Sequence, residues 1–506
     1  MFNLFKLHEP LEDYFPESWV CFQGQELKNT VKTIVSDILN SDIKKSHYSL
    51  CKKIGFKIGM CNNAVWNYLR HKRNVPIPII IELINEWQFT LKKEKDEVEK
   101  LKTNILENLE TLRVNNSASK DVFPIKKLSS DLSYFMGAHA ADGMISVHVT
   151  FSHKDEDFLL KFKDDLSKKL DTSIKSKIYY DKHKKSYNFG ITVDDLLNGK
   201  INHIISNHQL IKKRKIRVKR EFRWKLVDGQ FLPVDGLRKI IYDNFGLDLK
   251  LITAKNKKYF SLETKNKILA RYLHLFFGFP YGKKSRIVQE PSKIRHSQIN
   301  NRVAFLRGVF TFDGGVNVDG TIGLQIYSPF IFKSAQEILS LLSIDFNTSK
   351  SARKSFNIQK KGIDKKWLLL FKENTEKWHK LKAFRSETHT KKVSNENEFN
   401  MKISEIYPSN AQTKISVKKT MQLSKKLNNF DLKDYVKHVI QKEGINITLG
   451  TALAYLELLT RCNVLIKEKE KIFFIRKKGK QKNTNGAVMK RVFTYNPTIE
   501  NWRLPY

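Results

Sequence analysis

The spacing of apolar residues predicts helices near both ends of the chain and a mixed α and β region between them. In the N-terminal part, Val31, Ile34, Val35 and Ile38 recur at helical intervals, and a second helix is expected after the sequence PIP. The central region alternates apolar and polar residues with the period of two that is typical of strands. The strands expected there cover 145–152, 174–180, 186–193, 248–253, 258–262 and 321–328, with a helix over 154–170.

Residues 1–115 predict a helical domain. The stretch SLCKKIGFKIGMCNNAVWNYLRHKRNVP has the pattern of a helix, a Gly-containing turn and a second helix that buries Val65, Trp66 and Leu69. This pattern resembles a helix-turn-helix DNA-binding unit, and a small helical bundle with a polar face is the alternative. A charged helix over 91–113 is expected to lead into the central region. The residues expected to bind base edges and phosphates are Asn62, Asn63, Asn67, Arg70, Lys72 and Arg73.

Residues 415–506 predict a second terminal domain, separated from the centre by a polar linker over 391–414. Two helix-like segments precede the strands NVLIKEKEKIFFIRKK and MKRVFTY, which a basic loop connects. Helices followed by a basic hairpin indicate a winged-helix arrangement that binds DNA, and a generic α+β appendage is the alternative. The hairpin residues expected to contact DNA are Lys477, Lys478 and Lys480.

The net charge of the chain indicates which class of partner it binds. The chain has 506 residues, with 92 Lys and Arg against 52 Asp and Glu, and its formal net charge is +40. Such an excess attracts a polyanion through counterion release, so double-stranded DNA is the expected partner. A genome-wide preference for lysine is the alternative explanation. The four cysteines are too few and too scattered for a disulfide framework or a zinc site.

The first residues, MFNLFKLHEPLEDYF, are interrupted by acids and lack the apolar h-region of a signal peptide, so export is not expected, and no apolar run reaches the length of a membrane span. We therefore expect no membrane partner. If the source is prokaryotic, the expected location is the cytoplasm, in association with the nucleoid.

Two short segments share an unusual pattern. YFMGAHAADGMIS (134–146) and LRGVFTFDG (306–314) each place a glycine five positions before an Asp-Gly pair. Small residues let two helix backbones approach closely, so two such helices would bring their terminal carboxylates side by side. A carboxylate is unfavourable at a helix C-terminus, and divalent cations would relieve the conflict. Two acids sharing Mg²⁺ beside a phosphodiester suit two-metal hydrolysis, whereas a single Asp-Gly pair is more often a structural turn.

The two segments resemble the paired motifs of the LAGLIDADG homing endonucleases in their double-motif, single-chain form. The text GFPYGKKSRIVQEPSKI (278–294) before the second motif is similar to the linker of the archaeal and intein-encoded branch. The resemblance covers about 129–395. It implies an α+β fold with two αββαββ repeats about a pseudo-twofold axis, a first half over 129–300 and a second over 301–395. Their sheets would form a saddle over the major groove of the DNA, and the enzyme would act as a monomer.

The resemblance also implies roles for single residues. Asp142 and Asp313 correspond to the catalytic acids that bind metal, and Gly137 and Gly308 to the positions where the helices pack. The family places a lysine near each acid. The candidates are Lys284, Lys154 and Lys391, and each is alternatively one basic residue among many.

Three features depart from the family pattern. His139 and Phe312 occupy positions usually apolar or small, which predicts a looser helix interface. The strand QIYSPF has no lysine to match Lys154. Either 144–206 or 222–277 is expected to be an insertion in the first half, because both contain strands and a helix.

The stretch KKRKIRVKREFRWK (212–225) interleaves basic residues with Phe222 and Trp224. It suits a strand or arm that contacts phosphates, and a solvated basic strand is the alternative. Its residues expected to bind DNA are Lys213, Arg214, Lys215, Arg217, Lys219, Arg220, Arg223 and Lys225.

Together these features predict a site-specific homing endonuclease that breaks both DNA strands with Mg²⁺ or Mn²⁺. The chain neither begins with Cys or Ser nor ends in His-Asn, so a free-standing enzyme is expected rather than a self-splicing intein. A non-cleaving transcription regulator is one alternative, although it predicts loss of the acids. An RNA maturase that binds its own intron is another, because a basic saddle suits either polymer.

Overall fold

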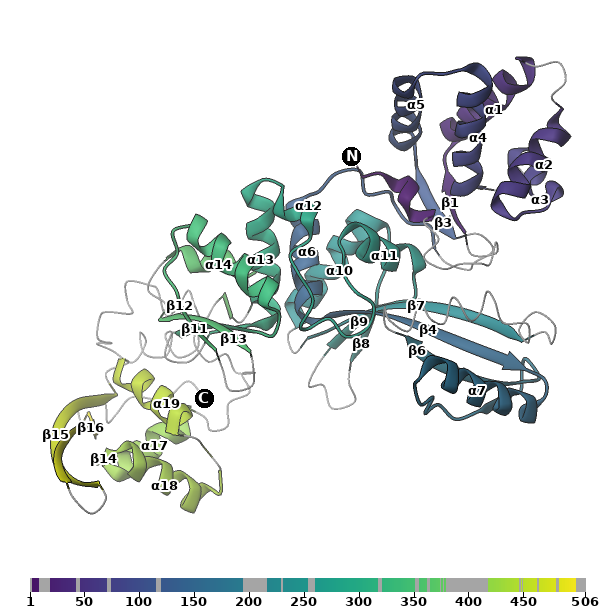
Figure 1. Ribbon diagram of the computed structural model, residues 1–506. Helices are drawn as coiled ribbons and strands as arrows, with labels where there is room; N and C mark the ends of the chain where they lie inside the picture. The colour runs from purple at the N-terminus through teal and green to yellow at the C-terminus, as the bar shows by residue number, and fades with distance from the viewer. Residues whose placement is uncertain are drawn as a thin grey trace. The chain divides into compact units, whose positions relative to one another are not determined.

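The computed structural model combines helices with antiparallel strands in each part of the chain (Figure 1). No helix in the described part is both long and apolar enough to cross a membrane. The chain forms two compact units, one of residues 1–312 with 328–334 and one of 313–327 with 335–506, and each is described by itself. The structure describes residues 2–8, 19–41, 46–70, 74–114, 120–193, 216–228, 231–253, 260–316, 321–350, 355–361, 365–373, 375, 377–378, 417–445, 447, 449–461, 464–478 and 482–496.

The N-terminal region combines helices with a small sheet of order β2-β1-β3. The strands were not expected from the sequence, because each is short and pairs with a distant segment. The elements are η1 (Leu4–His8), β1 (Val20–Gln23), α1 (Gln25–Asn40), α2 (His47–Ile58), α3 (Asn62–Leu69), β2 (Val75–Pro76), α4 (Ile77–Leu91), α5 (Lys95–Glu107) and β3 (Thr111–Val114).

Helices α2 and α3 are joined by a tight turn of three residues. Gly59 ends α2 with φ of 67°, a left-handed conformation that favours glycine. A side chain at Gly55 would overlap the carbonyl oxygen of Met60, so this glycine lets the turn fold back on α2. One expectation is wrong here. Trp66 is only half-buried, and Tyr68 is buried in its place.

The prediction of one helix over 91–113 is wrong at both ends. Helix α4 runs to Leu91, α5 covers only Lys95–Glu107, and Thr111–Val114 forms β3. Pairing of β3 with β1 overrides the local helical pattern. Helix α5 also buries Val98 and Ile105, so it packs against the domain and is not a fully solvated connector.

The first sheet has six antiparallel strands in the order β5-β6-β4-β7-β9-β8. Strand β4 lies almost entirely in 144–206, β7 begins at Arg217 and continues into 222–277, and β8 and β9 lie in 222–277, so both stretches contribute strands to one sheet. The segment between β4 and β7, residues 154–216, is called the insertion from here on. The elements are α6 (Ser130–Asp142), β4 (Gly143–His153), α7 (Glu156–Leu170), β5 (Tyr179–Asp181), β6 (Ser186–Val193), β7 (Arg217–Asp228), α10 (Phe231–Phe245), β8 (Lys250–Thr253) and β9 (Phe260–Thr264).

Without the insertion, the order is helix, strand, strand, helix, strand, strand. Phe135 of α6 packs against Trp224 of β7 and Phe245 of α10, with ring centroids 5.6 and 6.1 Å apart. These helices therefore cover the apolar face of the sheet. Figure 1 shows α7 beside the long strands β4 and β6. The strand expected over 174–180 is reduced to β5, because the residues before Tyr179 do not pair.

Residues 265–298 connect the first sheet to the helix of the second motif. This connection contains α11 (Lys267–Arg271), the π-helical turn η3 (Tyr272–Phe276) and α12 (Ser292–Arg295). Helix α13 (Ile299–Asp313) follows. Arg302 of α13 forms two hydrogen bonds of 2.9 Å with the buried carboxylate of Glu290, which fixes the start of α13 to this connection.

The second sheet has four antiparallel strands in the order β10-β11-β13-β12. Its element order after α13 is strand, strand, helix, strand, strand, as in the first half without the insertion. The elements are β10 (Gly314–Val316), β11 (Thr321–Ile326), α14 (Pro329–Leu341), β12 (Asn347–Lys350), β13 (Phe356–Lys361) and η4 (Lys365–Leu370).

The C-terminal region contains helices followed by a long antiparallel hairpin, in a sheet of order β14-β16-β15. Tyr435, Val439 and Leu456 are buried between the helices and the sheet. The elements are α17 (Val417–Leu427), β14 (Asn429–Asp431), α18 (Leu432–Glu443), α19 (Leu449–Arg461), β15 (Leu465–Lys478) and β16 (Lys482–Tyr495). The linker expected over 391–414 lies outside the described residues.

Helices α6 and α13 touch backbone to backbone at Gly137 and Gly308. A Cβ atom at Gly137 would overlap the carbonyl oxygen of Phe305 and lie 3.0 Å from Gly308 Cα. A Cβ at Gly308 would overlap the carbonyl oxygen of Tyr134 and lie 2.6 Å from the nitrogen of Ala138. Each glycine thus faces the carbonyl three residues before the other glycine. This reciprocity gives the contact a local pseudo-twofold symmetry.

We expect Gly137→Ala and Gly308→Ala each to lower the free energy of unfolding by about 1–3 kcal/mol, because the added methyl group forces the helices apart. Urea denaturation measures the change. Gly236→Ala in α10 is the matched control, since its Cβ would meet no neighbour within 4 Å. This control should gain about 0.5–1 kcal/mol, as Ala is the better helix former. Equal effects at all three sites would contradict the close contact.

Candidate nucleic-acid interface and its acids

Asp142 is the last residue of α6, and its side chain is exposed. Strand β4 begins at the next residue, so the Asp-Gly pair is a direct helix-to-strand junction and not a turn. Gly143 donates its N–H to the carbonyl of His139, and a side chain at Gly143 would overlap the His139 ring. The glycine is therefore required by close packing, with an ordinary φ of −75°.

Lys284 lies at the same end of α6. It is 8% exposed, and its Nζ donates to the carbonyl oxygens of Ala140 and, at 2.7 Å, Ala141. These carbonyls belong to the helix C-terminus, whose partial negative charge the ammonium offsets. The connection is fixed beside β4, because Gly282 donates its N–H to the carbonyl of Ile145 at 2.7 Å. Lys284 therefore lowers the electrostatic cost of a carboxylate at this helix end.

His139 is fully buried on the side of α6 that faces the sheet. Trp224 Nε1 donates a 3.0 Å hydrogen bond to His139 Nδ1, and the His139 ring lies edge-on to Phe279 with centroids 4.5 Å apart. Burial, followed by the charge of Lys284, holds the pKa of His139 well below its usual 6.5. His139 packs on Trp224 and Phe279, so it does not loosen the glycine contact. Phe312 is likewise buried in the second motif.

Asp313 is the last residue of α13, and its side chain is also exposed. Strand β10 begins at Gly314, so this motif likewise passes from helix to strand without a loop. Each acid lies five residues after its motif glycine. Among the residues that the structure describes, no group of three or more His, Cys, Asp or Glu side chains is placed to hold a metal ion.

Of the two other predicted lysines, Lys154 cannot serve Asp142. Strand β4 separates them, and its eleven residues span about 35 Å. That prediction is wrong because Lys154 follows the far end of the strand. Lys391 lies outside the described residues. Lys225 is closer in register, since it pairs with Met144, two residues after Asp142.

The exposed face of the first sheet is basic along β7. Side chains alternate between faces, so Phe222 and Trp224 are buried while Arg223 and Lys225 lie on the polar face. The aromatic residues of 212–225 are therefore core and do not contact a ligand. The polar-face residues of β7 are Arg217, Lys219, Glu221, Arg223 and Lys225, opposite Ser152, Thr150, His148, Ser146 and Met144 of β4.

Glu221 holds several of these cations in place. It pairs with Arg223, with Lys265 at 3.1 Å and with Lys219 at 3.9 Å. Burial alone would raise the pKa of Glu221, but the hydrogen bonds from Arg223 and Lys265 lower it overall. Lys225 forms a separate 2.8 Å ion pair with Glu263. The face keeps a positive excess and a defined arrangement of side chains.

His148 lies in the middle of this face, and sequence reasoning missed it. Its Nδ1 is 3.2 Å from Thr192 Oγ1 of β6, and a side chain at Gly190 would overlap its ring. Burial, followed by Arg223, lowers the pKa of His148 against the opposing effect of Glu221. The period-two alternation of β4 in the sequence would have identified it as a polar-face residue.

The second sheet presents amides where the first presents cations. Gln325 pairs in register with Asn357, and Gln359 with Asn347, which puts these side chains on one face. Gln359 and Asn347 are exposed. Amide side chains can donate and accept at the same time, as base edges require. Sequence reasoning missed these residues, although the alternation in FNIQKK marks their face.

The polar face of α3 is present as expected. Asn63 and Arg70 are exposed and Asn62 and Asn67 are half-buried. Arg70 lies 4.1 Å over the Trp66 ring, which restrains its guanidinium. The remaining predicted DNA-binding residues lie outside the described part, either entirely or in their side chains: Lys72, Arg73, Lys213, Arg214, Lys215, Arg220, Lys477, Lys478 and Lys480.

No protein-family model and no curated protein sequence matches the chain. Among solved structures, a crystal structure of I-DmoI in complex with DNA and Mn is similar over 28% of this chain and 75% of that chain, with 13% identity and a TM-score of 0.23. Mesophilic variants of the homing endonuclease I-DmoI are similar over 46% of this chain and 82% of that one, with 10% identity and a TM-score of 0.25. TM-scores this low do not establish a shared fold and carry no functional conclusion.

The lowered pKa of His139 makes folding acid-sensitive. Below pH 6.5 the unfolded chain takes up a proton at this residue, whereas the buried ring stays neutral, so stability falls as pH decreases. His139→Gln, whose side-chain oxygen also accepts from Trp224, should remove up to about 1.4 kcal/mol of pH dependence per unit below 6.5. Urea denaturation of both proteins at several pH values measures the difference. Identical pH slopes would contradict the buried neutral state.

Proposed function

We propose that the chain is a site-specific DNA endonuclease of the LAGLIDADG homing type. The observation that supports this most is the reciprocal contact of α6 and α13 at Gly137 and Gly308. Each helix continues for five residues beyond its glycine and ends on an exposed acid. Under this proposal, each acid would act on one strand of a duplex.

The donor set fits Mg²⁺ or Mn²⁺. Mg²⁺ prefers oxygen ligands and usually takes one or two protein carboxylates, with water and substrate phosphates completing the shell. Asp142 and Asp313 would supply the carboxylates, and a bound divalent ion would activate water and stabilise the leaving oxygen. Lys284 donates to the carbonyls of Ala140 and Ala141, so its charge offsets the partial negative charge of the helix end that carries Asp142.

The polar faces of the two sheets would bind the duplex. We assign the helix-strand-strand-helix-strand-strand order of each half to one LAGLIDADG repeat, with residues 154–216 inserted in the first. The cations of β7 would contact phosphates and supply affinity. The amides of β11 and β13 would contact base edges and supply selectivity.

Both terminal regions would add DNA contacts. Helix α3 presents Asn63, Asn67 and Arg70 on one face after a tight turn, as a recognition helix does. The C-terminal hairpin of β15 and β16 follows helices in the order expected for a winged-helix domain. These regions fit a transcription regulator equally well, and the two retained acids favour the nuclease.

Asp142→Asn and Asp313→Asn should each reduce double-strand cleavage at least about a hundredfold, because the amide binds divalent cations poorly while keeping its shape. The substrate is genomic DNA of the organism that carries the gene, with cut ends mapped by sequencing. Asp164→Asn, an exposed acid of α7, is the matched control and should cut at the wild-type rate. Wild-type protein that leaves the DNA intact in Mg²⁺, or acid variants that cut normally, would reject the nuclease.

The same variants separate the other functions. A regulator would bind a specific duplex without cutting it, and both Asn variants would bind equally. A maturase would accelerate splicing of the intron that encodes it, and would still do so with both Asn changes. Either result would replace the nuclease proposal.

Arg223→Ala and Gln359→Ala should affect DNA binding differently. Loss of one phosphate contact at Arg223 should weaken binding to all sequences and reduce the salt slope by about 1. Loss of a base contact at Gln359 should leave the salt slope unchanged and relax preference at one position, by about 1–3 kcal/mol. Binding of a randomised duplex pool at several salt concentrations, followed by sequencing, measures both. Identical effects of the two changes would contradict this division of roles.

A further inference from the structure

The first sheet carries an addition that the second sheet lacks. Strands β10 and β11 are joined through residues 317–320, whereas β4 and β7 are joined through the insertion, 154–216. Phe162 of α7 packs against Phe151 and Phe189, with ring centroids 5.3 and 6.3 Å apart. Helix α7 therefore covers the apolar face of the added strand β6 and leaves its polar face open.

The outer end of the first sheet gathers cations from two elements. Ser152 of β4 pairs with both Asn188 of β6 and Arg217 of β7. The β5–β6 turn and the start of β7 therefore lie at the same end of the sheet, about 10 Å apart by the spacing of strands. We define the outer cluster as the exposed residues Lys182, Lys184, Lys185, Arg217 and Lys219. Lys154 is left out because Asp155, Glu156 and Asp157 follow it.

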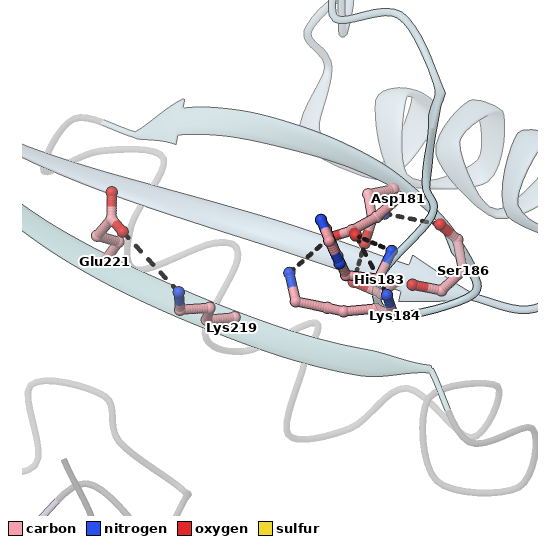
Figure 2. Close-up of polar contacts among 8 residues, drawn as sticks. Asp181, His183, Lys184, Ser186, Lys219 and Glu221 are labelled. Atoms are coloured by element: carbon pink, nitrogen blue, oxygen red, sulfur yellow. Dashed lines mark hydrogen bonds and ion pairs between the residues drawn. The ribbon is translucent and has the colours of Figure 1, made fainter. Parts of the chain in front are cut away.

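The turn is organised by its own residues. Asp181 Oδ1 accepts the backbone N–H groups of His183 at 3.1 Å and Lys184 at 3.2 Å, and Oδ2 accepts from Lys184 Nζ at 2.8 Å. Figure 2 shows these contacts together with the pair of Lys219 and Glu221 on β7. Asp181 thus holds the turn in one shape that projects Lys182 and Lys185 into solvent.

Lys185 has an unfavourable backbone conformation. Its φ of 47° lies in the left-handed region, where glycine is favoured and a β-carbon is strained. A glycine would relax the turn but would remove a positive charge from the outer cluster. Strain of this kind is concentrated at functional positions.

We propose that the outer cluster binds backbone phosphates of the DNA arm beyond the first half-site. The protein then covers more DNA on the side of the first sheet than on the side of the second. This inference rests on the proposed function, because the polar face must lie against DNA. Strand β4 spans about 35 Å, and a duplex rises about 3.4 Å per base pair. The contacted phosphates therefore lie about ten base pairs or slightly more from the cut.

The test compares two triple variants of the full chain. Lys182→Ala/Lys184→Ala/Lys185→Gly removes three charges from the outer cluster. Lys161→Ala/Lys163→Ala/Lys168→Ala removes three charges from α7, on the covered side of the sheet, and is the matched control. The probe is a duplex that wild-type protein selects from a randomised pool in EDTA, where no cutting occurs.

We expect the outer-cluster variant to lose hydroxyl-radical protection on one side of the site only, and its salt slope to fall by about 2–3. The α7 variant should keep the wild-type footprint and slope. Lys185→Gly alone should lower the slope by about 1 while keeping or raising the Tm, which separates loss of contact from unfolding.

The outcomes distinguish this inference from the proposed function. Wild-type protein that selects no duplex would overturn both. Wild-type protein that binds, together with an outer-cluster variant that keeps the full footprint and slope, would overturn the outer contact alone. Equal losses in both triple variants would also overturn it, because the effect would then follow net charge and not position.

Discussion

The backbone contact of α6 and α13 is the constraint on which the rest of the arrangement depends. Two helices approach this closely only where neither carries a side chain, and Gly137 and Gly308 occupy the two reciprocal positions. The contact fixes the register of one helix against the other, so the residues that end them have little freedom. His139 and Trp224 then fasten α6 to its sheet from the other side.

Successive side chains of a strand point to opposite faces of the sheet, so the two faces have different roles. Trp224 and Phe135 on the inner face build the core, whereas Arg223 and Lys225 remain outside. Substitutions on the polar face therefore leave the packing of the acid-bearing helix intact. The two halves also differ in kind, because cations dominate one polar face and amides the other. Under the proposed function, affinity and sequence preference would arise in different halves of the molecule.

Local sequence patterns predicted those helices and strands that are encoded by a short run of consecutive residues. The repeated spacing of Gly and Asp located α6 and α13, and period-two alternation located β4 and β6. Composition alone did not show which face of a strand each residue occupies. It grouped Phe222 with its basic neighbours, although Phe222 is buried. Partners that join distant segments, such as Lys284 at the end of α6, have no local pattern to reveal them. Lys154 is close to the first motif in sequence. It follows the far end of β4, however, and is therefore too distant from Asp142.

The direct junction of helix and strand has a mechanical consequence. With Asp142 ending α6 and Gly143 starting β4, no hinge separates the acid from the surface proposed to hold DNA, and Asp313 and Gly314 repeat the junction in the other half. Under the proposed function, each acid would keep a fixed position relative to the strand that follows it, so the duplex would have to bend to bring each phosphate to its acid. Deformation of DNA costs free energy that depends on base step. Base pairs between the half-sites would then be selected for flexibility without being touched.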